Sequence, residues 1–580
     1  MTVQIQRRDT DESLPLVERI LQSRGLSSDN LDFSLKGLAD FSKLKGIEAA
    51  CELLFEAIQN KKRILIVGDF DADGATSTAL AVDCLNKMGA SWVHYLVPNR
   101  FEYGYGLSPA ITELAHKEFQ PDLLITVDNG ISSFEGVDKA KELGMQVLVT
   151  DHHLAAGPLE SDLPNADAIV NPNQPNCEFV SKSACGCAVI FYVLCALRAH
   201  MLKHGFDNAS LPKMANYLDL VALASVADVV PLDENNRILV EQGLRRIRSG
   251  FARPGILALL QVSKKNHQQL TSKDFGFALG PRLNAAGRMD DMSIGIECLL
   301  SSTTENALSA AQLLEDLNNE RKQVEAGMQA QALIQLEKLP ESQVSGACSL
   351  CLFQADFHQG VIGLLASRLK EKYYRPVIVF APAKEGDNGP EAELKASGRS
   401  IPGFHLRDAL DLVAKRLPHA LSKFGGHAMA AGLSLNRKYL DEFKTCFEEV
   451  AAEMLTPELL VNCLTTDGMP ATQDFTINMA RKLRFVAPWG QNFPEPLFDG
   501  QFQVVNSRLI GADKNHLKLT LQLPNSTQLV DGILFSIERH GLDATQLYNL
   551  QNVHIVFEMD VNEFRGNESV QLMVRHLEII

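Results

Sequence analysis

The hydrophobic residues between Arg63 and Val170 form short continuous runs, and the segments between them carry apolar residues at helical spacing. A continuous apolar run is typical of a strand buried on both faces, and strands that alternate with helices predict a mostly parallel sheet covered by helices. The expected strands are residues 63–67, 91–96, 123–127, 146–150 and 168–170, and helices are expected at residues 14–23, 47–58, 109–117 and 133–143, with another that ends at Met88.

The pattern changes after residue 300. One long segment, residues 304–336, carries an apolar stripe at helical spacing that breaks at Arg321, which favours a single helix joining two domains over a coiled coil. Residues 347–452 predict a second α/β unit. Five short alternating runs at residues 502–509, 516–523, 529–535, 553–559 and 569–575 predict a small β-barrel that binds single strands.

These patterns divide the chain into five parts. We expect a helical lead-in at residues 1–60, a parallel α/β domain at 61–300, a connecting helix at 301–338, a second α/β domain at 339–455 and a barrel domain at 456–580. A length of 580 residues requires more than one core.

Composition narrows the class of protein. The net charge of −16 argues against a protein that coats DNA through a generally basic surface, although a nucleic-acid enzyme with one basic groove remains compatible with it. The 11 cysteines are an odd number scattered through apolar segments, which suits a reducing compartment. The first ten residues lack the apolar segment of a signal peptide, and the longest apolar run, residues 188–197, is too short to span a membrane. We therefore expect a cytoplasmic protein without a membrane segment.

The most informative stretch begins at the end of the first predicted strand, where Asp69, Asp71 and Asp73 precede Gly74. Three carboxylates in one turn repel one another unless a cation neutralises them, and oxygen ligands suit Mg²⁺, Mn²⁺ or Ca²⁺. An EF-hand loop would need a glutamate where Leu80 stands, and a P-loop would need a lysine that is absent. The remaining alternative is a solvated acidic turn that caps a helix.

Later strands end in similar groups. The third strand is followed by Asp128, and the fourth by Asp151-His152-His153. A buried run that begins at Leu218 contains Asp219 and Asp228, of which either could join the group. Parallel strands deliver their carboxyl ends to one edge of a sheet, so these side chains can converge. Carboxylates and imidazoles in this number predict a two-metal site for hydrolysis at phosphorus.

These motifs resemble those of the DHH phosphoesterase family, which takes its name from the sequence of residues 151–153. Residues 71–73, Asp128 and Asp228 resemble the other acidic motifs of that family, and Asp228 fits the fourth better than Asp219 does. Residues 100–107, 280–288 and 425–432 resemble motifs of one branch, the single-strand-specific 5′→3′ exonucleases. The match covers almost the whole chain in order. One departure is Val67, where many relatives carry a histidine ligand, so that another group or water would complete one metal position.

The resemblance implies roles for individual residues. It implies two Mn²⁺ or Mg²⁺ ions and catalytic residues Asp69, Asp71, Asp73, Asp128, Asp151, His152, His153 and Asp228. All of these except Asp151 and His153 are expected ligands. Asp151 would orient the imidazoles, and His153 would bind a metal or a non-bridging phosphate oxygen.

A second group of residues is expected to bind the nucleic acid. The guanidinium groups and the amide of residues 280–288 suit phosphate, although the arginines could instead pair with Asp290 and Asp291. The resemblance favours DNA contact and places the 5′-phosphate pocket in the second α/β domain. The expected DNA and 5′-phosphate contacts are Arg100, Tyr105, Arg282, Asn284, Arg288, Ser397, Arg399 and His427.

The implied fold is a DHH catalytic domain, a DHH-associated domain and an OB-like barrel. The implied activity is release of 5′-mononucleotides from single-stranded DNA in repair and recombination, by a monomer that meets a single-strand-binding protein and a RecQ-type helicase. Two alternatives stay open: a DHH phosphodiesterase for short oligonucleotides or cyclic dinucleotides, and a non-catalytic single-strand-binding scaffold in replication.

Overall fold

The computed structural model describes residues 3–27, 31–99, 103, 106–338, 346–384, 386–387, 389–540, 542, 544–547, 550–564 and 566–580. The chain folds into two compact units. One contains residues 26–319 and 484–495, and the other contains residues 1–25, 320–483 and 496–580.

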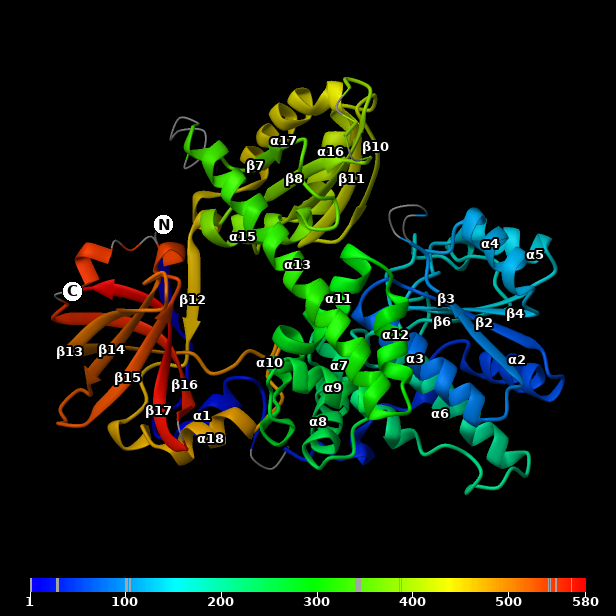
Figure 1. The fold of residues 1–580 in the computed structure, drawn as a ribbon, viewed down its shortest axis with the longest axis horizontal. Helices are drawn as coiled ribbons and strands as arrows, with labels where there is room; N and C mark the ends of the chain where they lie inside the picture. Colours follow the sequence, from blue (N-terminus) through cyan, green and yellow to red (C-terminus); the bar gives the residue numbers. More distant parts are fainter. Residues whose placement is uncertain are drawn as a thin grey trace. The chain divides into compact units, whose positions relative to one another are not determined.

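A five-stranded parallel sheet, in the order β3-β2-β4-β5-β6, is the centre of the first unit. Figure 1 shows α4 and α5 on one face of this sheet and α2, α3 and α6 on the other. Because both faces are covered, residues 64–67 are at most 1% exposed, which explains their continuous apolar run. The strands are β2 (Arg63–Gly68), β3 (Trp92–Leu96), β4 (Leu123–Val127), β5 (Gln146–Thr150) and β6 (Ala168–Val170), and the helices are α2 (Ile47–Gln59), α3 (Ala72–Lys87), α4 (Pro109–Phe119), α5 (Phe134–Glu142) and α6 (Gly186–Lys203).

Helix α6 is long and apolar enough to cross a membrane by length and composition alone. Two thirds of it, 67%, is buried inside the protein, where it packs beside α3 and α2. It is therefore a core helix of this unit.

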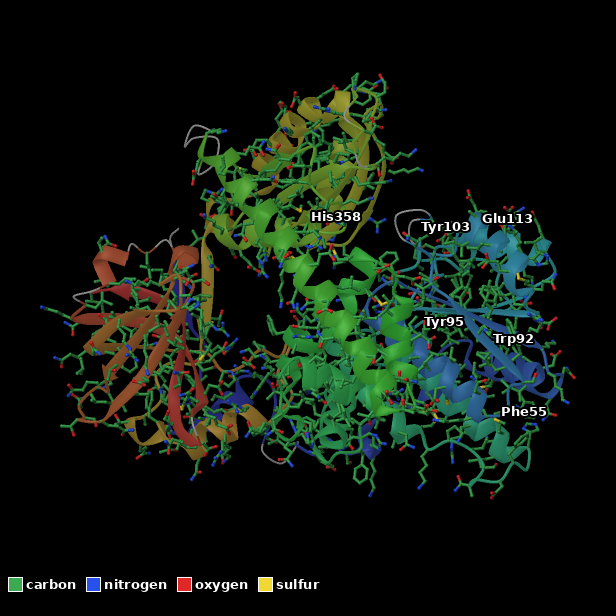
Figure 2. The ribbon with its side chains drawn as sticks, in the orientation of Figure 1. Phe55, Trp92, Tyr95, Tyr103, Glu113 and His358 are labelled. Carbon is green, nitrogen blue, oxygen red and sulfur yellow. The ribbon has the colours of Figure 1, made fainter. Side chains whose placement is uncertain are left out.

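After the sheet, the chain of the first unit continues as a series of helices. The buried run that begins at Leu218 is helix α7 (Leu218–Ala227), which ends at Asp228. It is followed by α8 (Glu234–Arg248), α9 (Pro254–Val262), α10 (Ser272–Asp274), a π-helical turn η7 (Phe275–Leu279), α11 (Gly280–Met289) and α12 (Ser293–Leu300). Helix α12 packs beside α3, and its Glu297 accepts a hydrogen bond at 2.6 Å from the hydroxyl of Tyr95 on β3. Tyr95 is labelled in Figure 2.

The predicted connecting helix is confirmed as α13 (Thr304–Glu337), 34 residues long. Its apolar stripe breaks at Arg321 because this buried side chain forms an ion pair with Glu325 at 2.6 Å. Glu325 also accepts a hydrogen bond from Arg368 at 2.8 Å. The charged interruption thus has partners within the fold.

A mixed sheet in the order β10-β11-β9-β8-β7 forms the predicted second α/β domain. Strand β7 runs parallel to β8, and the other neighbours are antiparallel. Phe380, Phe443 and Phe447 are fully buried in its core. The strands are β7 (Leu350–Phe353), β8 (Val377–Pro382), β9 (Glu393–Arg399), β10 (Leu421–Gly426) and β11 (Ala430–Asn436), and the helices are α15 (Ile362–Tyr373), α16 (Leu406–Arg416) and α17 (Leu440–Met454).

The C-terminal strands close into a barrel in the order β13-β14-β15-β17-β16, as the alternating runs predict. The strands are β13 (Phe498–Ile510), β14 (His516–Gln522), β15 (Leu529–Phe535), β16 (Asn552–Phe564) and β17 (Asn567–Ile579), preceded by α18 (Ile477–Phe485).

The N-terminal segment differs from a helical lead-in. Helix α1 (Leu16–Gln22) forms where a helix is expected, but β1 (Val3–Arg7) is a strand that pairs in parallel with β12 (Asn462–Thr466). Val3 and Ile5 alternate with glutamines, a strand pattern of only five residues. Its partner is far away in the sequence, so the helical periodicity next to β1 gives no sign of the pairing.

Candidate metal centre

The loop between β2 and α3 presents the first three carboxylates. Asp71 is the N-cap of α3, and its side chain accepts a hydrogen bond from the Gly74 amide at 3.0 Å. A Cβ atom at Gly74 would lie 2.4 Å from the Asp69 carbonyl oxygen, so glycine is required for this tight turn. The acidic cap proposed as an alternative therefore exists, but in a loop where Asp69 is itself buried.

Asp73 points from the first turn of α3 toward the start of α6. Its Oδ2 accepts from the Gly186 amide at 2.7 Å and its Oδ1 from the Cys187 amide at 2.8 Å. Burial and the neighbouring Asp71 raise the pKa of this carboxyl to about 7, although the two hydrogen bonds oppose the shift. Nearby positive charge would therefore favour the ionised form of Asp73 at neutral pH.

Asp128 follows β4 with a left-handed backbone, φ 63°, which turns its side chain toward the same place. A Cβ atom at residue 186 would lie 2.6 Å from the Asp128 Cβ and 2.7 Å from its Oδ1, so only glycine leaves room for this carboxylate. Burial, followed by the charges of Asp73 and Asp71, raises the pKa of Asp128 well above its usual value. Gly186 is a site residue that the sequence pattern does not reveal, because a glycine at the start of a helix gives no sign of a carboxylate that follows a distant strand.

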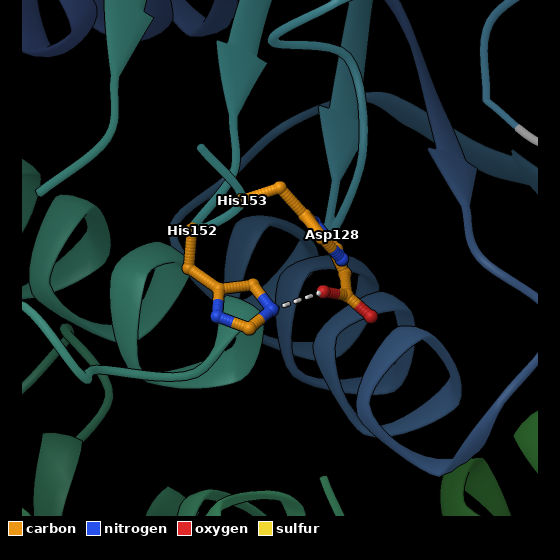
Figure 3. A group of neighbouring side chains, drawn as sticks. All are labelled: Asp128, His152 and His153. Atoms are coloured by element: carbon orange, nitrogen blue, oxygen red, sulfur yellow. Dashed lines mark ion pairs between the residues drawn. The ribbon is translucent and has the colours of Figure 1, made fainter. Parts of the chain in front are cut away.

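His152 lies at the centre of the group. Its Nε2 atom is 3.1 Å from Asp128 Oδ1, as Figure 3 shows. The same atom lies 3.5 Å from Asp228 Oδ2 and 3.9 Å from Asp73 Oδ2. Residues from β4, β5, α3 and α7 thus meet at the carboxyl edge of the sheet.

Asp151 and His153 form a pair beside this group. The Asp151 carboxylate contacts His153 Nδ1 at 2.7 Å and accepts hydrogen bonds from the amides of Ile131 and His152. Burial alone would lower the pKa of His153, but the bond to Asp151 and the surrounding carboxylates raise it to about 9. Asp151 therefore orients the His153 ring and favours its charged form.

The two aspartates at the α7 segment occupy different environments. Asp219 is buried and faces Arg253, whose Nε lies 3.1 Å from its Oδ2. Asp228 ends α7 beside His152, and burial together with Asp73 and Asp71 raises its pKa well above the usual value. The structure thus brings Asp228, and not Asp219, to the group.

Val67 faces away from the carboxylates. Its side chain packs with Leu65, Leu124 and Ile111 in the apolar layer between the sheet and α4. Its carbonyl oxygen accepts from the Asn129 side chain at 3.1 Å, which ties the ends of β2 and β4 together.

The donor set fits hard divalent cations. Three groups of side chains each place their ligand atoms within 4.8 Å of one another: Asp69, Asp71 and Asp128; Asp73, His152 and Asp228; Asp128, His152 and His153. Carboxylate oxygens with an imidazole suit Mn²⁺ and Mg²⁺. Because burial and mutual repulsion raise the pKa of Asp73, Asp128 and Asp228, a bound cation would relieve an electrostatic cost that the fold itself imposes.

The basic residues predicted on α11 have other partners. Arg282 Nε lies 2.5 Å from Glu315 of α13, and its Nη1 donates to the Ala278 carbonyl. Asn284 Oδ1 accepts from the Ala72 amide at 2.7 Å. Arg288 is half-buried on the same helix. Arg282 therefore does not form the surface pair with Asp290 or Asp291 that was the alternative prediction. DNA contact by Arg282, Asn284 and Arg288 stays a prediction.

Two residues that are predicted to bind the 5′-phosphate, Ser397 and Arg399, lie close together on β9. Arg399 Nη1 donates to Ser397 Oγ at 2.9 Å and to the Gly398 carbonyl at 2.8 Å. Gly363, in the first turn of α15, faces both side chains, since a Cβ there would lie 2.9 Å from each. His427 follows β10 in the turn to β11, whose Ala430 pairs with Arg399. Arg100 and Tyr105 lie outside the described residues.

Family models cover most of the chain. The N-terminal domain of the DHH family matches residues 63–225, the DHHA1 domain matches residues 344–453 and the RecJ OB domain matches residues 466–576. The fold and the acidic edge thus define a DHH-family protein, which confirms the predicted fold class and resemblance.

Full-length relatives narrow the family. The chain is 47% identical to the single-stranded-DNA-specific exonuclease RecJ of Escherichia coli over 99% of both chains. It is 33% identical to RecJ of Bacillus subtilis over 99% of this chain and 70% of that one. The crystal structure of Thermus thermophilus RecJ in complex with Mn²⁺ covers the whole chain with a TM-score of 0.79 at 27% identity, matching 80% of that structure. The chain belongs to the RecJ family of single-stranded-DNA-specific exonucleases.

Proposed function

We propose that this chain is a metal-dependent exonuclease that hydrolyses single-stranded DNA from its 5′ end and releases 5′-mononucleotides. The observation that carries the proposal is the meeting of Asp73, Asp128, His152 and Asp228 at one edge of the sheet, within 3.9 Å of the His152 Nε2 atom. The family relationship supports the choice of substrate.

The proposed ligands of two Mn²⁺ or Mg²⁺ ions are Asp69, Asp71, Asp73, Asp128, His152 and Asp228. When bound, a pair of such ions activates a water molecule and stabilises the leaving oxygen at phosphorus. The α6 amides of Gly186 and Cys187 hold Asp73 in place, and the space at Gly186 admits Asp128.

His153 has a separate proposed role. Its Nδ1 atom is engaged by Asp151, which leaves Nε2 as the atom that can reach a ligand. The proposed role of this imidazole is to bind a non-bridging phosphate oxygen or a metal ion.

The 5′ end is proposed to bind at Ser397 and Arg399. Burial lowers the pKa of Arg399, and among the residues that the structure describes no acidic side chain pairs with it. A half-buried guanidinium beside a hydroxyl and the first turn of α15 favours a phosphate group. Arg100 and His427 are proposed to complete this pocket.

Cleavage of labelled single strands tests the activity. We expect wild-type protein with Mn²⁺ to shorten a single strand labelled internally, starting at its 5′ end, and to release mononucleotides, while a blunt duplex stays intact. Asp128→Ala should abolish cleavage with an unchanged melting temperature in EDTA. Cleavage of cyclic dinucleotides alone would favour the small-substrate alternative, and binding without cleavage would favour the scaffold alternative.

Arg399→Ala tests whether the proposed 5′-phosphate pocket determines which end of the strand is recognised. We expect the variant to lose its preference for 5′-phosphorylated over 5′-hydroxyl strands, measured as the ratio of kcat/KM for the two substrates. Arg416→Ala is the matched control, since Arg416 is a solvent-accessible arginine of the same domain that pairs with Glu453. An unchanged ratio in Arg399→Ala would refute the pocket assignment.

The biological setting extends the same proposal. The barrel and the family relationship support single-stranded DNA as the partner. Contact with a single-strand-binding protein and a RecQ-type helicase, a monomeric state, a cytoplasmic location and a role in DNA repair and recombination all stay predictions.

A further inference from the structure

Helix α11 touches the acidic loop on one side of Asp71. The Asn284 side-chain oxygen accepts a hydrogen bond from the Ala72 amide at 2.7 Å. Ala72 is the first residue of α3, directly after Asp71. The amides at a helix start have no partner within the helix, so Asn284 supplies one from a different segment of the chain.

The same helix touches the loop on the other side of Asp71. A Cβ atom at Gly287 would lie only 1.8 Å from the carbonyl oxygen of Phe70. Backbone cannot move away from such a contact as a flexible side chain can, so glycine alone permits α11 to lie this close. Phe70 and Ala72 flank Asp71, and each is held by one residue of α11.

Asn284 and Gly287 are three residues apart and therefore lie on the same face of the helix. The helix is itself anchored, because Arg282 pairs with Glu315 of α13 and donates to the Ala278 carbonyl at 2.7 Å. Residues 70–72 are thus held by two contacts with α11, and α11 is itself held by the contacts of Arg282.

We propose that Asn284 and Gly287 are positioning residues that hold the Asp71 carboxylate in place for metal binding. The inference rests on the proposed metal site and goes beyond it. It also gives Asn284 a role different from the DNA contact that its motif suggests. A DNA-contacting Asn284 would act on substrate affinity, whereas a positioning residue acts on metal affinity, and the two effects can be measured separately.

The first test uses Asn284→Ala and the near-isosteric Asn284→Asp, which retains an oxygen to accept from Ala72. Mn²⁺ affinity is measured by electron paramagnetic resonance without DNA, and single-strand affinity is measured in EDTA. We expect Asn284→Ala to weaken Mn²⁺ binding about tenfold, in line with other residues that orient metal ligands. Asn284→Asp should restore most of that affinity, and DNA affinity should stay the same in both. Unchanged Mn²⁺ affinity in Asn284→Ala would overturn the inference, whether or not DNA binding falls. Asn306→Ala is the control, an exposed asparagine in the first turn of α13.

The second test uses Gly287→Ala against Gly327→Ala. Both positions are helical, but a Cβ at Gly327 meets nothing within 4 Å. We expect Gly287→Ala to weaken Mn²⁺ binding at least as much as Asn284→Ala does, and Gly327→Ala to leave it unchanged. Equal Mn²⁺ affinity of Gly287→Ala and Gly327→Ala would contradict a positioning role for the close contact between Gly287 and Phe70. If Gly287→Ala fails to fold, as judged by melting in EDTA, the Asn284 pair decides alone.

Failure of the proposed function would look different. A wild-type chain that binds Mn²⁺ but leaves single-stranded DNA intact would refute the nuclease proposal, while the binding measurements would still decide the roles of Asn284 and Gly287.

Discussion

Two regions of the molecule bury carboxylates, and they differ in what neutralises them. Where β1 and β12 meet the start of the barrel, Asp467 pairs with Arg8 and Arg24, and Asp499 pairs with Arg7 at 2.7 Å. At the carboxyl edge of the parallel sheet, Asp73, Asp128 and Asp228 instead lie around His152.

The pKa values follow this difference. Burial would raise the pKa of Asp499, but hydrogen bonds from Arg7, Thr466 and His554 outweigh it and lower the pKa. Burial and like charges both raise the pKa of Asp128. The guanidinium beside Asp499 thus makes it a structural carboxylate, whereas Asp73, Asp128 and Asp228 raise one another's pKa, a cost that a bound cation would relieve.

The largest expected effect is a difference in catalysis between variants of two aspartates of the α7 segment, Asp228 and Asp219. Asp228→Asn should lower kcat/KM for single-stranded DNA by about a thousandfold or more, since it removes a proposed ligand worth several kcal/mol in the transition state. Asp219→Asn should leave Mn²⁺ affinity unchanged and lower the free energy of unfolding by about 3–5 kcal/mol, because it leaves Arg253 buried without its charged partner. Cleavage kinetics on single-stranded DNA, Mn²⁺ titration and urea unfolding of both variants check this contrast, and loss of Mn²⁺ binding in Asp219→Asn would contradict it.

The structural carboxylates should respond to loss of a guanidinium and not to metal. Arg24→Ala removes two hydrogen bonds to the buried Asp467, each 2.9 Å long, and should cost about 3 kcal/mol of stability. We expect the same loss with and without Mn²⁺, measured by urea unfolding. Arg416→Ala, in an exposed pair with Glu453, is the matched control and should change stability little. If Mn²⁺ reversed the loss of stability in Arg24→Ala, Asp467 would respond to metal, and the contrast with the aspartates at the sheet edge would fail.

The smallest expected effect concerns pH. The folded-state pKa of Asp73, about 7, lies above its ordinary value of 3.8, so the folded protein binds more protons than the unfolded chain between these limits. Without metal, the stability that protonated Asp73 contributes is complete below about pH 4 and is lost as pH rises through about 7. Because Mn²⁺ replaces those protons, its stabilising effect should be larger at pH 8 than at pH 5.5, by a few degrees in melting temperature. Equal Mn²⁺-induced shifts at the two pH values would contradict this coupling.

Much of the fold could be predicted from local pattern. The continuous apolar runs specify β2, β4 and β5 because strands covered on both faces are built mostly from apolar residues, and the alternating runs specify the barrel strands. The strand β1 could not be predicted this way, since five residues carry a weak signal and the partner strand begins at Asn462.

The sequence predicted which residues belong to the candidate site, but it did not predict how they are arranged. Strand ends identified Asp128 and His152, because the carboxyl ends of parallel strands share one edge. The family motif favoured Asp228 over Asp219, and the pairing of Asp219 with Arg253 from the start of another helix adds a reason that only the structure could give. The roles of Gly186, Asn284 and Gly287 depend on contacts between segments far apart in the chain.

The sequence by itself determined the order of strands and helices, the set of acidic and imidazole side chains at the strand ends, and the family to which they point, because these follow from spacing and residue type. Only the tertiary structure decided which aspartates keep a guanidinium and which are left facing one another. The physical reason is that the charge state of a buried carboxylate depends on which groups surround it in space, and those groups come from distant parts of the chain.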